Sequence, residues 1–255
     1  MILPRRVLAI GLLLAFGAAR LPFEVHLEKQ SLDLQIKAAR LSMEVREEVS
    51  QLSFIAALSG FRSFVAACLW IEAHSAWERT QWGRMAGLFN TVTTLQPRSL
   101  LYWDLASWHM AWNASIAALQ DEKQPSEALR VRAQRQYFQL GRDFLERGIQ
   151  NNPDRYQLYE KLAVLLRDKL EDPCASAAAF DKAASFPDAP PYLKRFAAYE
   201  LAQCPGRERE AYDRMKEIFA KGVHERMPTL LSKIREFEET LQIPEDQRLK
   251  MEPPQ

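Results

Sequence analysis

Prolines divide the chain between Phe61 and Ile243 into short segments, and this feature most limits what the chain can fold into. Within the segments, apolar residues recur at helical spacing, and the alternation of apolar and polar residues typical of surface strands is absent. Pro153 and Pro187 stand 34 residues apart, a period at which pairs of helices repeat. The sequence therefore predicts an all-α fold built from helix pairs that end at proline.

The helix pairs resemble the tetratricopeptide repeat. When Pro97 closes the first pair, Ala73 and Phe89 occupy positions where the family prefers small and aromatic residues, and Trp103 matches the family preference in the next pair. The resemblance implies a right-handed α-solenoid of such helix pairs over residues 61–243, with a capping helix from Pro228 to Leu241. The run from residue 60 to residue 113 is also similar to membrane-anchored bacterial proteins of this type.

Residues 1–23 contain two arginines followed by an apolar segment. Arg5 and Arg6 precede the run from Val7 to Ala19, which as a helix spans about 20 Å, less than a bilayer core of about 30 Å. That length favours a cleaved signal peptide, whereas flanking apolar residues and a snorkelling Arg20 lengthen it enough for a signal anchor. A buried amphipathic helix is the third alternative. The positive charge before the segment predicts that the rest of the chain crosses the membrane.

Residues 24–60 are predicted to form a juxtamembrane amphipathic helix. Neither Pro nor Gly occurs from Leu27 to Leu58. Apolar residues form a narrow seam there, at Leu34, Ala38, Leu41, Val45, Leu52 and Ile55. Glu48 interrupts the seam, and Gly60 ends the helix. The seam fits a stalk or self-pairing helix, and it equally fits a helix packed on the domain that follows.

All 6 tryptophans of the chain lie between Trp70 and Trp112. The resemblance implies that the first helix of each pair lines a concave groove, where partners of such proteins bind. It places these residues on that face: Trp70, His74, Trp77, Asp104, Trp108 and Trp112. Trp offers a large rigid contact area with one polar group, which suits an extended apolar or proline-containing peptide. We therefore expect these six residues to bind a partner protein or peptide.

Two other interpretations apply to the same residues. If the helix from Leu27 to Leu58 fills the groove, the tryptophans are core and the protein is a structural subunit of an envelope or transport complex. A more distant interpretation is an enzyme that uses His74 or His109. Glu78 follows His74 by four residues, but neither a second pair of metal ligands nor a nucleophile motif accompanies either histidine. We expect no catalytic residue.

Composition argues against several functional classes. The formal net charge is +1, and Arg130, Arg132 and Arg135 lack the interleaved aromatic residues of a nucleic-acid surface, so we expect no nucleic-acid partner. The chain has only 9 glycines and contains neither a phosphate-binding loop nor a dinucleotide-binding motif. The sequence therefore predicts no cofactor and no metal site.

The 3 cysteines carry a prediction about compartment. Cys174 begins one predicted helix and Cys204 ends the next, and in a stack of antiparallel helices these two ends lie at the same edge. A disulfide there requires an oxidising compartment, which the amino-terminal segment also predicts. Two unpaired, partly buried thiols are the alternative. Cys68, among Ala66 and Leu69, is predicted to be a packed core thiol.

Residues 244–255 contain several charges and Pro253 and Pro254, which predicts a disordered tail. Together these features predict a non-catalytic scaffold that binds a partner through the tryptophan-lined groove. We expect it to be a single-pass protein of a bacterial inner membrane, with its main domain in the periplasm.

Overall fold

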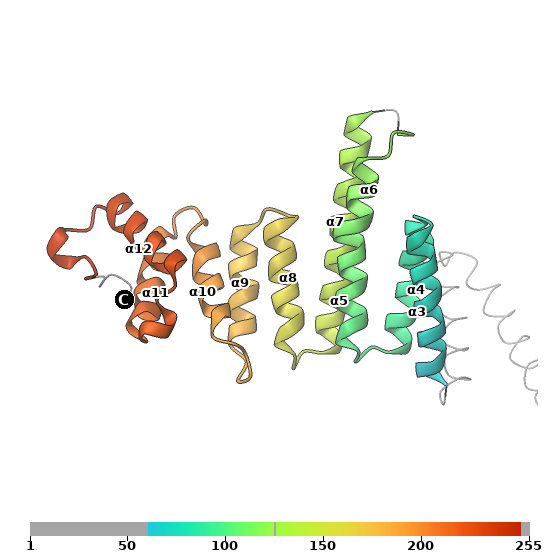
Figure 1. The fold of residues 1–255 in the computed structure, drawn as a ribbon, viewed down its shortest axis with the longest axis horizontal. Coiled ribbons are helices and arrows are strands. Elements are labelled where there is room, and N and C mark those ends of the chain that lie inside the picture. Colours follow the sequence, from blue (N-terminus) through green and yellow to red (C-terminus); the bar gives the residue numbers. More distant parts are fainter. Residues whose placement is uncertain (1–60, 125, 251–255) are drawn as a thin grey trace, which may run out of the picture. The chain divides into compact units, whose positions relative to one another are not determined.

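Helices joined by short turns make up the regular structure of the computed structural model, which describes residues 61–124 and 126–250 (Figure 1). Contacts divide the chain into two units between Gly60 and Phe61, and the described residues belong to the second unit. The expectations for residues 1–23 and 24–60 lie outside the described residues. Over the described part no strand occurs, and the prediction of an all-α fold is confirmed.

The first helices run from the start of the second unit to the turn at Pro153. They are α3 (Arg62–Glu78), α4 (Trp82–Leu95), α5 (Leu100–Trp108), the π-helical stretch η1 (His109–Ala114), α6 (Ser115–Leu119) and α7 (Glu127–Asn151). The rest of the unit contains α8 (Tyr156–Asp168), α9 (Pro173–Ala184), α10 (Tyr192–Leu201), α11 (Glu208–Ala220), η2 (Val223–Glu225), α12 (Pro228–Thr240) and η3 (Glu245–Gln247). Short turns reverse the chain between successive helices, so each packs mainly against its neighbours in sequence.

Buried apolar side chains form a core between the helices. Around α3 to α8 the core contains Phe89, Trp103 and Phe144, and smaller clusters lie around Phe180 and around Tyr212 further along the chain. Alanines fill many of the remaining buried positions, which lets the helices pack closely.

The prolines that end the helix pairs also join one pair to the next. The carbonyl of Pro97 accepts hydrogen bonds from Trp103 Nε1 at 2.9 Å and from Asn152 Nδ2 at 2.8 Å. Asn152 is buried in the turn before Pro153 and also donates to the carbonyl of Gly148 at 2.9 Å. The turns at Pro97 and Pro153 are therefore joined by the hydrogen bond from the buried Asn152 side chain to the Pro97 carbonyl.

The two helices between Leu100 and Asn151 are longer than those of the other pairs. The first continues from α5 through η1 into α6, and the second is α7 (Figure 1). The hydroxyl of Ser126 caps the start of α7 by accepting a hydrogen bond from the amide of Leu129. A Cβ placed on Gly141 would lie 2.7 Å from the Cβ of Ala111, so only glycine allows α7 to approach η1 this closely. The π-helical stretch thus occurs where two backbones meet.

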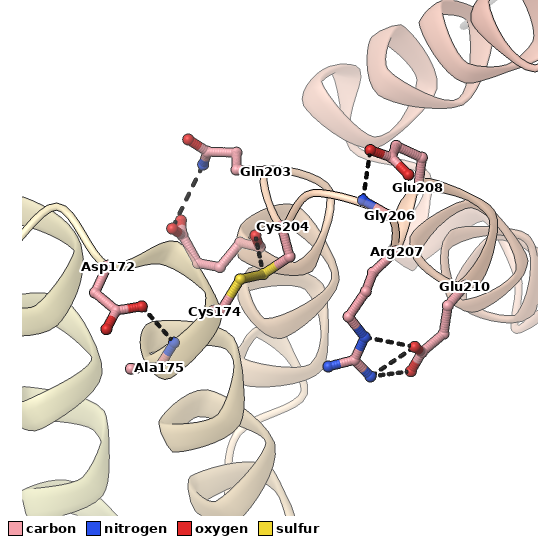
Figure 2. The surroundings of a disulfide bond; sticks show 10 residues. Asp172, Cys174, Ala175, Gln203, Cys204, Gly206, Arg207, Glu208 and Glu210 are labelled. Atoms are coloured by element: carbon pink, nitrogen blue, oxygen red, sulfur yellow. Dashed lines mark hydrogen bonds and ion pairs between the residues drawn. A yellow bond between two sulfur atoms is a disulfide. The ribbon is translucent and has the colours of Figure 1, made fainter.

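The two cysteines expected to pair form a disulfide in the structure. Cys174 lies in the first turn of α9 and Cys204 lies just after α10, and their Cα atoms are 5.3 Å apart (Figure 2). The carboxylate of Asp172 accepts from the amide of Ala175 at 2.9 Å, which caps α9 beside the bridge. Antiparallel packing of α9 and α10 brings these two helix ends together.

Two expectations from the sequence are wrong in the described part. Cys68 is an exposed, free thiol and not a core residue, because it lies on the face of α3 opposite the buried Ala66 and Ala73. Residues 244–250 are not disordered: they contain η3, and the amide of Leu249 donates to the buried carboxylate of Glu238 at 2.8 Å. The remainder of the expected tail, residues 251–255, lies outside the described residues.

Candidate functional site

A cavity of about 240 Å³ lies between the α5–η1 helix, α7 and α8. We call it the groove, and its lining residues are Asp104, Ser107, Trp108, Trp112, Leu145, Lys161, Val164 and Asp168. On each side these residues recur every three or four positions, because that spacing keeps side chains on one face of a helix. Three of the six residues expected to bind a partner therefore line one cavity: Asp104, Trp108 and Trp112.

An ion pair crosses the groove. Lys161 Nζ on α8 lies 3.1 Å from Asp104 Oδ2 on α5. Further along α8, the carboxylate of Asp168 is paired with Arg167 of the same helix at 2.6 Å. Each carboxylate of the groove thus has a cationic partner within the chain, and the groove offers an incoming group no unbalanced charge.

The two tryptophans of the groove keep part of their indole surface accessible. Trp108 is 43% exposed, whereas Trp103, one turn earlier on the same helix, is 3% exposed. Trp112 is half-buried, and the ammonium of Lys169 lies 5.1 Å from the centre of its ring. Accessible indole beside a cavity is the surface that can hold an apolar group from a partner.

The hydroxyl of Ser107 has no hydrogen-bond partner, although the side chain is buried and lines the groove. A buried hydroxyl without a partner costs about 1 to 3 kcal/mol. Most serines in helices avoid this cost, as Ser115 does by donating to the carbonyl of Ala111 at 2.7 Å. Ser107 therefore holds a buried polar group without a partner among the residues that line the groove.

A row of aromatic rings connects α3 to the groove. The ring of His74 is 5.1 Å from that of Trp77, Trp77 is 5.8 Å from His109, and His109 is 5.0 Å from Trp108. Trp70 lies beside this row, 5.1 Å from Tyr102. The structure thus places Trp70, His74 and Trp77 outside the lining of the groove, with Trp70 and Trp77 packed against the core.

His109 is enclosed by this row. Its ring is 9% exposed and touches Phe89 as well as Trp77 and Trp108. Burial, and to a smaller extent the nearby His74, lowers the pKa of His109 to about 4. Asn113 Nδ2 lies 3.0 Å from Nδ1 of His109, and an amide that donates there requires an unprotonated ring nitrogen. His109 is thus a neutral, packed imidazole.

His74 has the opposite environment. It is exposed, and its Nε2 lies 3.8 Å from Glu78 Oε1. This acidic partner is one feature that a catalytic histidine needs, but none of the described cavities is lined by His74. In the part of the chain that the structure describes, no cluster of His, Cys, Asp and Glu could hold a metal ion.

Sequence reasoning did not assign Ser107 or Lys161 to the site. Ser107 lines the groove, and a lone serine in a helix carries no sequence signal of such a position. Lys161 belongs to the groove through its pairing with Asp104, a residue far away in sequence. Both omissions concern packing between helices, which the residues of a single helix do not reveal.

Two further results bear on classification. Among the described residues, no helix combines the length and the apolar character needed to cross a membrane. Comparison with protein-family models, with curated proteins and with solved structures gives no match.

Proposed function

We propose that the second unit is a non-catalytic binding module, a tetratricopeptide-like α-solenoid that holds a peptide segment of a partner protein in the groove. The observation that carries this proposal is the cavity itself, beside which Trp108 and Trp112 keep accessible indole surface. An apolar side chain of the peptide packs on Trp108 and Trp112. The balanced charges of Asp104 and Lys161 favour an uncharged side chain in the cavity.

The disulfide supports the compartment that we propose. Cys174 and Cys204 pair in the structure, and such bridges persist in oxidising compartments. Together with the two arginines before an apolar amino-terminal segment, this favours a single-pass inner-membrane protein whose second unit is periplasmic. In that setting the peptide belongs to an envelope protein.

A second candidate is a structural subunit whose groove is permanently occupied. Trp70 and Trp77 favour it, because both are half-buried and packed against the core instead of lining the cavity. In that case truncation of any tryptophan on this face destabilises the fold. The catalytic interpretation has less support, because His109 is neutral and enclosed and His74 lines none of the described cavities.

Matched tryptophan variants test the proposal. The full chain, in detergent and with its disulfide oxidised, is panned against a phage-displayed library of random peptides. Enriched peptides should bind Trp108→Ala at least tenfold more weakly, while the unfolding midpoint of this variant stays near that of the unaltered chain. Trp103→Ala should lower the midpoint strongly, since Trp103 is core. A Trp108→Ala variant that unfolds as readily as Trp103→Ala supports the structural subunit. Enriched peptides that bind Trp108→Ala as tightly as the unaltered chain overturn the proposal that the groove binds peptide.

A further inference from the structure

The helix α3 carries a large apolar surface on the side away from the core. Ala66, Ala73 and Ala76 are buried on one side, and the opposite side carries Phe61 at its start, then Phe64, Cys68 and Ile71. We call these four residues the α3 stripe. Phe61, Phe64 and Ile71 are 66%, 68% and 69% exposed, more than any tryptophan of the groove. Steps of three and four residues keep the stripe on one line along the helix.

The area of the α3 stripe matches what one partner contributes to a protein interface. With roughly 200 Å² for a large apolar side chain, Phe61, Phe64 and Ile71 together expose on the order of 400 Å². A standard interface buries about 800 Å² on each partner, and a little over half of that is apolar. The largest apolar patch on a typical monomer is about 300 to 600 Å², and such patches are often functional.

The order of residues along the stripe fits a second copy of the same helix. Small residues, Ala67 and Cys68, stand between the bulky Phe64 and Ile71. If two α3 helices cross antiparallel about a two-fold axis at Ala67 and Cys68, Phe64 of each copy packs against Ile71 of the other. The small residues then lie at the crossing point, where the helix axes approach most closely.

The neighbouring helix α4 provides room for this approach. Glu72 and Arg84 form an ion pair that fastens the start of α4 beside the stripe. One turn after Arg84, Gly87 presents bare backbone, because a Cβ added there would meet nothing within 4 Å. A helix of a second copy can therefore lie against α4 without a steric obstacle from this chain.

We infer that the α3 stripe, together with the face of α4 around Gly87, is the surface through which two copies of this chain pair. This surface is separate from the groove, so pairing does not rest on the proposed peptide binding. The pairing brings the two Cys68 thiols close to each other at the two-fold axis. Since Cys174 and Cys204 are bonded to each other, Cys68 is the free thiol among the chain's 3 cysteines and reports on the contact without any engineering.

Thiol crosslinking of the full chain tests the inference. The protein is purified in detergent with its disulfide oxidised, treated with a short bis-maleimide over a range of concentrations, and analysed by gel and intact mass. We expect a covalent dimer joined at Cys68, with a yield that rises with protein concentration. Sedimentation velocity of the untreated protein should show the same concentration dependence.

Three variants separate pairing from damage to the fold. Phe64→Glu places a charge in the proposed contact, and Gly87→Leu fills the open space while improving the helix propensity of α4. Each should reduce the crosslinked dimer at least tenfold without lowering the unfolding midpoint. Val223→Glu alters another exposed apolar residue, on η2, and should leave the dimer yield unchanged.

Several results would overturn the inference. One is a chain that stays monomeric at every concentration while Cys68 reacts freely. A monomer with a protected Cys68 would mean that another segment of the same chain covers the stripe. A dimer that persists unchanged in both Phe64→Glu and Gly87→Leu would place the contact elsewhere.

Discussion

Lys161 Nζ and Asp104 Oδ2 lie 3.1 Å apart and join α8 to α5 across the groove. Both side chains remain partly exposed to water, so the pair is screened. Its position matters more than its strength, since it neutralises the only carboxylate that α5 contributes to the groove lining in the described residues.

Replacement of the lysine should therefore have a small effect on stability. We expect Lys161→Met to change the free energy of unfolding by less than about 1 kcal/mol, the usual range for partly exposed ion pairs. Urea denaturation followed by circular dichroism measures this. A loss well above that range would show that Asp104 becomes a buried, uncompensated charge.

Removal of the Ser107 hydroxyl should stabilise the fold. Ser107→Ala eliminates a buried group without a partner, so the free energy of unfolding should rise by about 1 kcal/mol. Ser115→Ala is the matched control, because that hydroxyl donates to the carbonyl of Ala111, and it should be neutral or destabilising. Equal stability of the two variants would contradict the prediction.

Glycine is required where α7 meets η1. In Gly141→Ala the new Cβ would lie 2.7 Å from the Cβ of Ala111 and 3.0 Å from the carbonyl of Ser107, so we expect a loss of about 1 to 3 kcal/mol. Gly87→Ala is the control, because it meets open space and should gain up to about 1 kcal/mol from helix propensity. Thermal unfolding of the two variants should shift in opposite directions.

The disulfide between Cys174 and Cys204 should stabilise the fold. It joins residues separated by 30 positions, and a loop of that length contributes on the order of 3 kcal/mol in the chain-entropy model. Cys174→Ser, or reductant added to the unaltered chain, should lower the free energy of unfolding by that amount. Cys68→Ser should change it by less than about 0.5 kcal/mol, because that thiol is exposed. A reductant effect that depends on Cys68 would refute the assignment.

Stability should fall in mild acid because of His109. Its pKa in the folded state is lowered to about 4 by burial, whereas an unfolded histidine titrates near 6.5, so the unfolded chain binds the proton first as pH falls. The stabilising contribution is complete above about pH 6.5 and is lost as pH falls towards 4, a change on the order of 2 kcal/mol. His109→Gln removes this titration. The unaltered chain should therefore lose more unfolding free energy than His109→Gln between pH 7 and pH 4. Its stability advantage over the variant should shrink as the pH falls. A constant difference would count against the prediction.

Helix class and helix ends were predictable because they depend on local chemistry. Proline is excluded from helix interiors and tolerated in the first turn, where Pro173 and Pro228 begin α9 and α12. Apolar residues that recur every three or four positions are likewise recognised without any distant contact. For the same reason the turns at Pro97 and Pro153 and the helix from Pro228 onward lie where the sequence places them. The repeat resemblance placed Trp103 at a packing position and Trp108 on the groove face, and in the structure Trp103 is 3% exposed and Trp108 is 43% exposed.

The sequence by itself determined that the described part of this protein is all-α, where its helices end, and which cysteines stand at helix ends that can meet. Only the tertiary structure decided that Cys68 faces water, that Leu249 is tied back to Glu238, and that Ser107 and Lys161 belong to the groove. The reason is physical. Backbone preferences act within a few residues of the chain, whereas exposure, ion pairing and cavities depend on how separate helices approach each other, and that approach is set by the packing of side chains distant in sequence.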